Sequence, residues 1–164
     1  MAKFADLIEQ FDPIEGQPSD TDLTQIQKVV APLLLQILYE KTGGTHNLIG
    51  LIRTVAAYTT RYGAEFIKPT RGGSYDATID GDAMAFFHAC TEAAHKSKRA
   101  DCGTYKTERK ETVQFIFVVV EDTWVRELRD TEDFYTNFAP KALLAHLQVG
   151  CTVSHALYLL ALHN

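Results

Sequence analysis

Three side chains that could bind a metal recur at helical spacing in HACTEAAH, residues 88–95. His88, Glu92 and His95 stand at positions i, i+4 and i+7, so a helix would place all three on one face. Glu92 and His95 also make an ExxH pair, the kind that ligates iron in carboxylate-bridged helical bundles. Such a centre needs two ExxH pairs and two further glutamates, whereas this sequence contains one pair. We therefore expect structural or surface roles for these side chains and no metal site.

The nucleophiles of the chain lack the groups that would activate them. An apolar helical setting disfavours the thiolate of Cys90, so we expect this cysteine to be inert. Ser154 and His155 are neighbours in sequence and would point in different directions on a helix, which gives no triad geometry. The patterns HExxH and GxSxG are absent, and the glycine-rich stretch KPTRGGSYDATIDGD lacks the GxxxxGK[ST] pattern of a phosphate loop. We expect no catalytic residue, no cofactor and no small-molecule substrate.

The charge balance argues against a protein whose main task is to bind nucleic acid. The chain has 164 residues and a net charge of −5, whereas binding a phosphate backbone needs a concentrated basic surface. A local basic patch nevertheless lies between residues 96 and 111, while residues 112–133 hold six acids against two arginines. The basic patch consists of Lys96, Lys98, Arg99, Lys106, Arg109 and Lys110. We expect a solvated helix surface, although opposed patches of this kind could also pair between neighbouring subunits.

Cysteine use and hydropathy indicate a cytoplasmic protein. The three cysteines are widely spaced and form no CxxC pair, which predicts neither a disulfide framework nor a thiolate zinc site. The N-terminal sequence MAKFADLIEQF has no continuous apolar stretch typical of a signal peptide, and no run approaches 18 uninterrupted apolar residues. We therefore expect a chain in the reducing cytosol that makes no membrane contact.

The N-terminal part of the sequence predicts an arm followed by a helix. Two prolines and a glycine close together interrupt residues 1–20, so this segment is expected to form an N-terminal arm and a loop. Ser19 or Asp20 can cap a helix whose apolar positions continue at helical spacing to Leu38. Pro32 falls inside this helix and predicts a kink or a split.

A second helix completes the N-terminal helical part. It is expected to begin at Thr45 or Asn47 and to stop near Gly63. The glycine-rich stretch that follows has little periodicity and marks the best boundary along the chain. The expected segments are the arm and loop 1–20, the helical pair 21–67, the loop or linker 68–82 and the helical bundle 83–164, with pair and bundle forming one compact unit.

The apolar run within QFIFVVVEDTWVREL, residues 114–128, could form a strand or a helix. Its three consecutive valines suit a strand. However, residues 104–139 contain neither glycine nor proline, and apolar and aromatic side chains recur at intervals of three or four residues, which predicts a helix buried on most of its sides. We expect this helix to continue through Trp124, after a separate helix that ends near Ala100 and before one with Thr136 or Asn137 near its N-cap and Pro140 in its first turn. The fold class is therefore all-α, an irregular bundle of five to seven helices with an N-terminal arm.

Aromatic side chains are dense in the second half of the chain. Most of them are expected in the core. Three, however, fall in a short connection between helices, where aromatic side chains can anchor a partner subunit. These candidate interface residues are Phe134, Tyr135 and Phe138.

Three segments of the second half resemble a known family. AAHKSKRADCGTYKTERKETVQFI, VVEDTWVRELRD and FYTNFAPKALLAHL are similar to the helical Gag region of copia-type LTR retrotransposons, especially those of unicellular algae such as diatoms. The resemblance is best over residues 93–148. It implies a capsid-like, self-assembling structural protein that packages the element's RNA in the cytoplasm. It also implies framework roles for Trp124, Leu128, Leu143, Leu144 and Leu147.

Two functions stay open on this basis. The first is a non-enzymatic, Gag-like domain that forms homo-oligomers through helix and loop contacts. The CCHC zinc knuckle and basic tail of Gag proteins are absent from these 164 residues, so RNA binding would need a region downstream. The second is an all-helical adaptor or regulatory domain that binds a protein helix or a peptide in an apolar groove.

Overall fold

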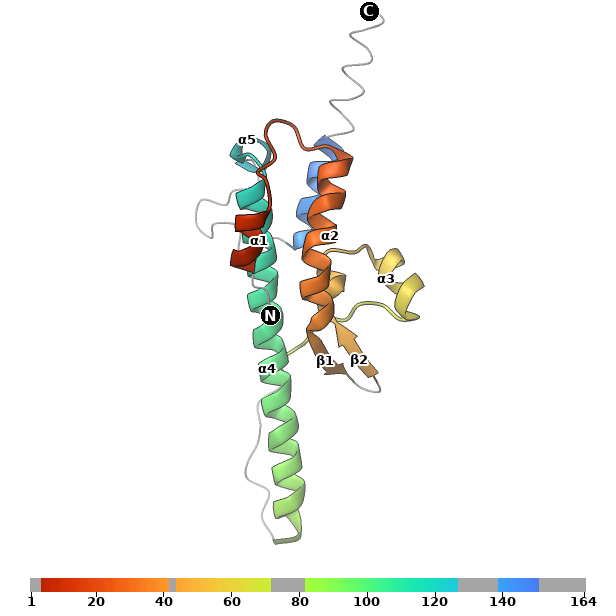
Figure 1. The fold of residues 1–164 in the computed structure, drawn as a ribbon. Helices are drawn as coiled ribbons and strands as arrows, with labels where there is room; N and C mark the ends of the chain where they lie inside the picture. Colours follow the sequence, from red (N-terminus) through yellow and green to blue (C-terminus); the bar gives the residue numbers. More distant parts are fainter. Residues whose placement is uncertain (1–3, 42–43, 72–81, 127–138, 151–164) are drawn as a thin grey trace, which may run out of the picture.

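The protein is all-α, with one short β-hairpin. The computed structural model describes residues 4–41, 44–71, 82–126 and 139–150, and for 39–41, 44–46 and 82–90 only the backbone. Along the chain the elements are α1 (Phe4–Gln10), α2 (Asp20–Gln36), β1 (Leu38–Lys41), β2 (Gly44–Asn47), η1 (Leu48–Leu51), α3 (Val55–Tyr62), α4 (Asp82–Val119) and α5 (Asp122–Val125), followed by a helical segment at 140–150 (Figure 1). The predicted fold class is confirmed.

Helix α2 begins at a capping box, which confirms one of the two expected N-caps. The Ser19 side chain accepts a hydrogen bond from the Asp22 N–H (3.2 Å), and the Asp22 carboxylate accepts one from the Ser19 N–H (2.8 Å). Of the two expected caps, Ser19 is therefore the one used. The helix also continues through Pro32 without the expected split. Pro32 and Lys28 are both exposed, so water can reach the Lys28 carbonyl, which lacks an N–H partner from the proline.

The expected helix after Gly44 is replaced by three shorter elements. Leu38 does not extend α2 but begins β1, which pairs with β2 in antiparallel register from Leu38 opposite Asn47 to Lys41 opposite Gly44. The Asn47 side chain then caps η1, and Thr54 caps α3 by accepting from the Ala57 N–H. Two local caps thus divide a segment whose apolar spacing suits one helix, because Asn and Thr side chains compete for backbone N–H groups. Helix α3 ends at Gly63, in the left-handed conformation (φ 72°), as predicted.

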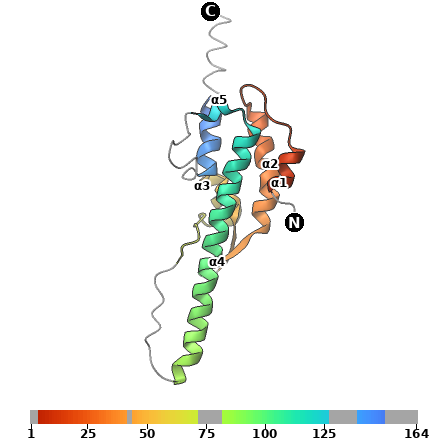
Figure 2. The same cartoon turned by 90° about the vertical axis from the view of Figure 1, so that its left-hand side faces the viewer.

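Helix α4 is a single element of 38 residues, about 57 Å long at 1.5 Å per residue. The expected break near Ala100 is absent, because the helix passes through Gly103 without interruption. The run QFIFVV is helical, as the spacing of its apolar residues predicts. The lower half of α4 projects beyond the other described elements, which gather around its upper half (Figures 1 and 2).

The prediction that α4 continues through Trp124 is wrong. The Ile14 N–H donates to the Val119 carbonyl (2.7 Å), and Ile14 forms an isolated parallel bridge with Val120. This bond uses the carbonyl that the next helical turn would have used. The chain therefore leaves the helix at Val120 and starts the separate short helix α5, where Trp124 packs half-buried against the core.

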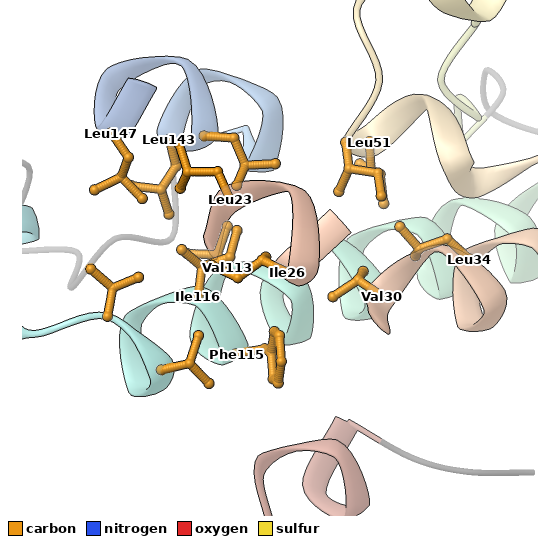
Figure 3. Packing of buried hydrophobic residues seen from close by; sticks show 14 of the residues in the cluster. Leu23, Ile26, Val30, Leu34, Leu51, Val113, Phe115, Ile116, Leu143 and Leu147 are labelled. Carbon is orange, nitrogen blue, oxygen red and sulfur yellow. The ribbon is translucent and has the colours of Figure 1, made fainter. Parts of the chain in front are cut away.

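The core surrounds the upper half of α4. In Figure 3, Val113 and Ile116 of α4 face α2 and the segment 140–150, whereas Phe115 lies on the side toward α1. The Phe115 ring is fully buried and packs against Phe4 (6.2 Å between centroids) and edge-on against Phe11 (5.5 Å). The predicted N-terminal arm is thus partly helical, as α1, and packs apolar side chains. The other residues of the buried core cluster from these elements are Leu23, Ile26, Val30, Leu34, Val119, Leu143, Leu144 and Leu147.

The Phe66 ring packs against residues of α3, η1 and α4. It lies 5.4 Å from Tyr58 of α3 and 6.4 Å from Tyr105 of α4, measured between centroids. It also packs directly on Gly50, where an added Cβ would overlap the ring. The η1 backbone can therefore approach Phe66 only because Gly50 has no side chain.

Gly50→Ala is expected to lower the free energy of unfolding by about 1–3 kcal/mol, because the new methyl group would displace the Phe66 ring from a packed site. Urea unfolding followed by circular dichroism measures the change. An unchanged midpoint would contradict the close packing of Phe66 on η1.

Gly103→Ala is expected to have the opposite effect. Gly103 lies inside α4, is exposed, and has no heavy atom within 4 Å of the position of an added Cβ. Alanine removes backbone freedom from the unfolded chain without a steric cost, so stability should rise by about 0.5–1 kcal/mol. The same unfolding experiment serves as the measurement, and a loss of stability would argue against a continuous α4 at this point.

Candidate assembly surfaces

In the projecting part of α4, residues 91–100 are hardly covered by the described residues of the chain. Of residues 91–100, nine are exposed and His95 is half-buried. The described contacts with the apolar core begin further along, at Tyr105. Most helical stability in proteins comes from packing an apolar face, and this segment has no such face to pack. Its surface is therefore available to solvent and to partners.

Four of the six predicted basic residues form one line along α4. Lys96, Arg99, Lys106 and Lys110 are separated by three, seven and four residues, which places them within about 80° of one another at 3.6 residues per turn. All four are exposed. We call these four residues the basic stripe. The structure separates it from the other two patch residues: Lys98 and Arg109 lie on another side of the helix, where Arg109 is half-buried.

Glu92, one of the three residues considered as metal ligands, forms an ion pair with Lys96 of the basic stripe. The Lys96 Nζ lies 2.8 Å from Glu92 Oε1, and both side chains are more than half exposed. The hydrogen bond and charge of Lys96 lower the pKa of Glu92, and Glu92 raises the pKa of Lys96 in the same way. Among the described side chains, no group of three or more His, Cys, Asp and Glu residues could hold a metal ion. The side chains of His88 and Cys90 lie outside the described residues, as do Ser154 and His155.

The candidate interface aromatics Phe134, Tyr135 and Phe138 also lie outside the described residues. The aromatic residues of the second half that are described belong to the core or pack against it: Phe115 is fully buried, and Phe117 and Trp124 are partly buried. Cys102, for which the sequence suggested no role, is buried and free.

A hollow that the sequence did not predict lies between α1, the following loop and α2. It has a volume of about 490 Å³. Half-buried Leu7, Phe11, Ile14 and Val29 supply apolar surface, and the exposed carboxylates of Asp12 and Glu15 stand in its lining. We call this feature the acidic hollow. The loop that forms it is held to the far end of α4 by the bond from Ile14 to Val119 and by the Gly16 N–H, which donates to the Glu121 carboxylate (3.0 Å).

A signal for the acidic hollow was present in the sequence. Residues 4–22 contain six carboxylates and neither lysine nor arginine. The excess of acids over bases is greater here than in residues 112–133, which hold six acids and two arginines. The apolar part of the hollow could not be predicted, because it depends on how α1 and the loop pack against α2.

Searches with family models, among curated proteins and among solved structures find no match to this chain. In the described part of the chain, no helix has the length and apolar character needed to cross a lipid bilayer.

A partly buried carboxylate on α4 sets an expectation for the pH dependence of stability. Burial raises the pKa of Glu108 above its ordinary value of 4.5, and the negative charge of Glu111 adds to this shift. The folded state therefore binds the proton of Glu108 more tightly than the unfolded state. Its ionisation destabilises the fold as the pH rises above 4.5.

Glu108→Gln is expected to stabilise the protein at pH 7, because the substitution removes a charge that is ionised in an unfavourable site. The gain should disappear near pH 4, where the glutamate is largely protonated in both states. Unfolding midpoints of the two proteins across this pH range test the prediction, with Glu65→Gln at an exposed position as the control. A gain that is equal at both pH values would assign the effect to something other than the titration of Glu108.

Proposed function

We propose that this chain is a non-enzymatic structural protein, a Gag-like helical domain that self-associates in the cytoplasm. The observation that carries the proposal is the stretch of α4 at residues 91–100, where nine of ten side chains are exposed and none belongs to the described apolar core. A helix of this kind is costly to keep ordered unless a partner uses it. The sequence resemblance over residues 93–148, which covers most of this stretch, supports the same function.

Self-association of this kind does not require one large interface. Individually weak contacts become effective when symmetry or repetition multiplies them, as in shells and filaments. Surfaces with a concentrated charge suit such contacts, because they select the orientation of the partner more than they raise the affinity. The basic stripe and the acidic hollow are surfaces of this type. Any packaging of RNA would use a region outside these residues.

The acidic hollow also supports the second candidate, an adaptor domain that binds a helix or a peptide. An opening of about 490 Å³ with apolar surface could take the side chains of a short ligand. The adaptor function requires a monomer or a fixed dimer, whereas the Gag-like function requires assemblies that grow with protein concentration.

The two candidates are distinguished by light scattering coupled to size-exclusion chromatography over a wide range of protein concentration. For the Gag-like domain, we expect the mean mass to rise with concentration. We also expect the mean mass to decrease when the salt concentration is raised, since surface charges are screened beyond about 10 Å at 0.1 M salt. Runs with and without single-stranded RNA show whether nucleic acid promotes growth. A constant mass under every condition would refute self-association and favour the adaptor.

A further inference from the structure

We propose that the basic stripe of one copy of this chain binds in the acidic hollow of a second copy, so that the molecules associate head to tail. The inference rests on the proposed function, because it names the two surfaces through which the chain would self-associate. Three observations carry it: the segregation of charge, the make-up of the hollow, and the distance between the two surfaces within one molecule.

Charge is divided between the two surfaces more sharply than the net charge of −5 suggests. Residues 4–22 carry six acids and no lysine or arginine. Residues 96–110 carry six basic residues against Asp101 and Glu108. Two copies that bring these segments together gain attraction at the contact, although each molecule as a whole is negative. Such complementarity steers association and excludes other orientations.

The acidic hollow has the composition that lysine and arginine side chains require. Their long methylene stems pack on apolar surface while the charged ends remain at the edge. Leu7, Phe11 and Val29 provide the apolar surface, and Asp12 and Glu15 provide carboxylates for charge-assisted hydrogen bonds. The volume of about 490 Å³ is within the range of about 300–1,000 Å³ typical of binding pockets. The exposed stripe on α4 offers four such side chains on one side of a rigid helix.

The geometry of one molecule directs this contact to a second copy. The loop of the acidic hollow is held at the end of α4, where Ile14 bonds to Val119. Along the same helix, Arg99 precedes Val119 by 20 residues and Lys110 precedes it by nine, about 30 Å and about 14 Å. Because α4 is one continuous helix, the Arg99 end of the stripe cannot reach the hollow of its own chain, so the stripe as a whole can enter only the hollow of another copy. A contact between two different surfaces is heterologous, so each added copy presents a new stripe and a new hollow, and growth continues unless a ring closes.

Charge reversal on either surface tests this contact. The stripe variant carries Arg99→Glu, Lys106→Glu and Lys110→Glu, and the hollow variant carries Asp12→Lys and Glu15→Lys. Each variant alone would face like charges at the contact, and we expect its association to weaken at least about tenfold. The equimolar mixture should recover association, because each altered surface meets one of opposite charge. Circular dichroism checks folding, and glutamine at the same five positions replaces any reversal variant that does not fold.

A matched control separates the stripe from a general effect of charge. Arg53→Glu, Lys68→Glu and Arg71→Glu make the same change in net charge at exposed positions outside both surfaces. This control should associate like the parent chain.

Each outcome of the experiment decides a separate point. If the parent chain associates and both reversal variants associate equally well, the head-to-tail contact is refuted while self-association stands. If the parent chain remains a monomer at every concentration, the contact and the proposed function are both refuted. If the parent chain binds single-stranded RNA through the stripe, and the hollow variant binds it equally well without any association of the protein, the stripe is a nucleic-acid surface and the contact is again refuted.

Discussion

The apolar run from Phe115 to Val120 constrains the rest of the structure. The five of these residues that lie on α4, Phe115 to Val119, point in every direction around the helix axis, so no single neighbour can cover them. The chain solves this by packing α2 and the segment 140–150 on one side of α4 and α1 on another, around Phe115. Val118 remains about half exposed (54%), which marks the side that no described element covers. The N-terminal arm is therefore a structural part of the core.

The same packing determines where α4 ends and where the acidic hollow forms. Once α1 is held against Phe115, the loop that follows α1 reaches the end of α4, and the Ile14 N–H donates a hydrogen bond to the Val119 carbonyl. That hydrogen bond ends the helix and leaves a hollow between α1, the loop and α2. One interaction thus accounts for the break before α5 and for the position of Asp12 and Glu15. Both features arise from residues more than 100 positions apart in sequence.

The two ends of α4 differ in chemistry as well as in burial. Its upper half has an apolar side that the core encloses as well as the exposed Lys106 and Lys110, whereas nine of the ten residues 91–100 are exposed and include Lys96 and Arg99 of the basic stripe. A long helix with one enclosed and one free half is suited to connect molecules, because the enclosed half anchors it and the free half presents side chains at a fixed distance. The segregation of acids toward the N-terminal arm gives the two ends of the molecule opposite local charge. These properties are what the described residues offer as a basis for function.

Local sequence determined the elements whose ends depend on one or two residues. Ser19 and Gly63 mark helix ends that the structure places where their chemistry predicts, and Pro140 lies in the first turn of its helix as expected, because caps and fixed dihedrals act within a single turn. The helix of Pro140 begins at residue 140, however, later than a cap at Thr136 or Asn137 would allow. Periodicity likewise identified QFIFVV as helix and Leu143, Leu144 and Leu147 as buried. Tertiary structure decided the rest. The end of α4 before Trp124 and the acidic hollow both depend on which surfaces meet. Apolar spacing indicates that a side chain is buried, but only packing decides what buries it and which backbone groups remain for another segment to bind.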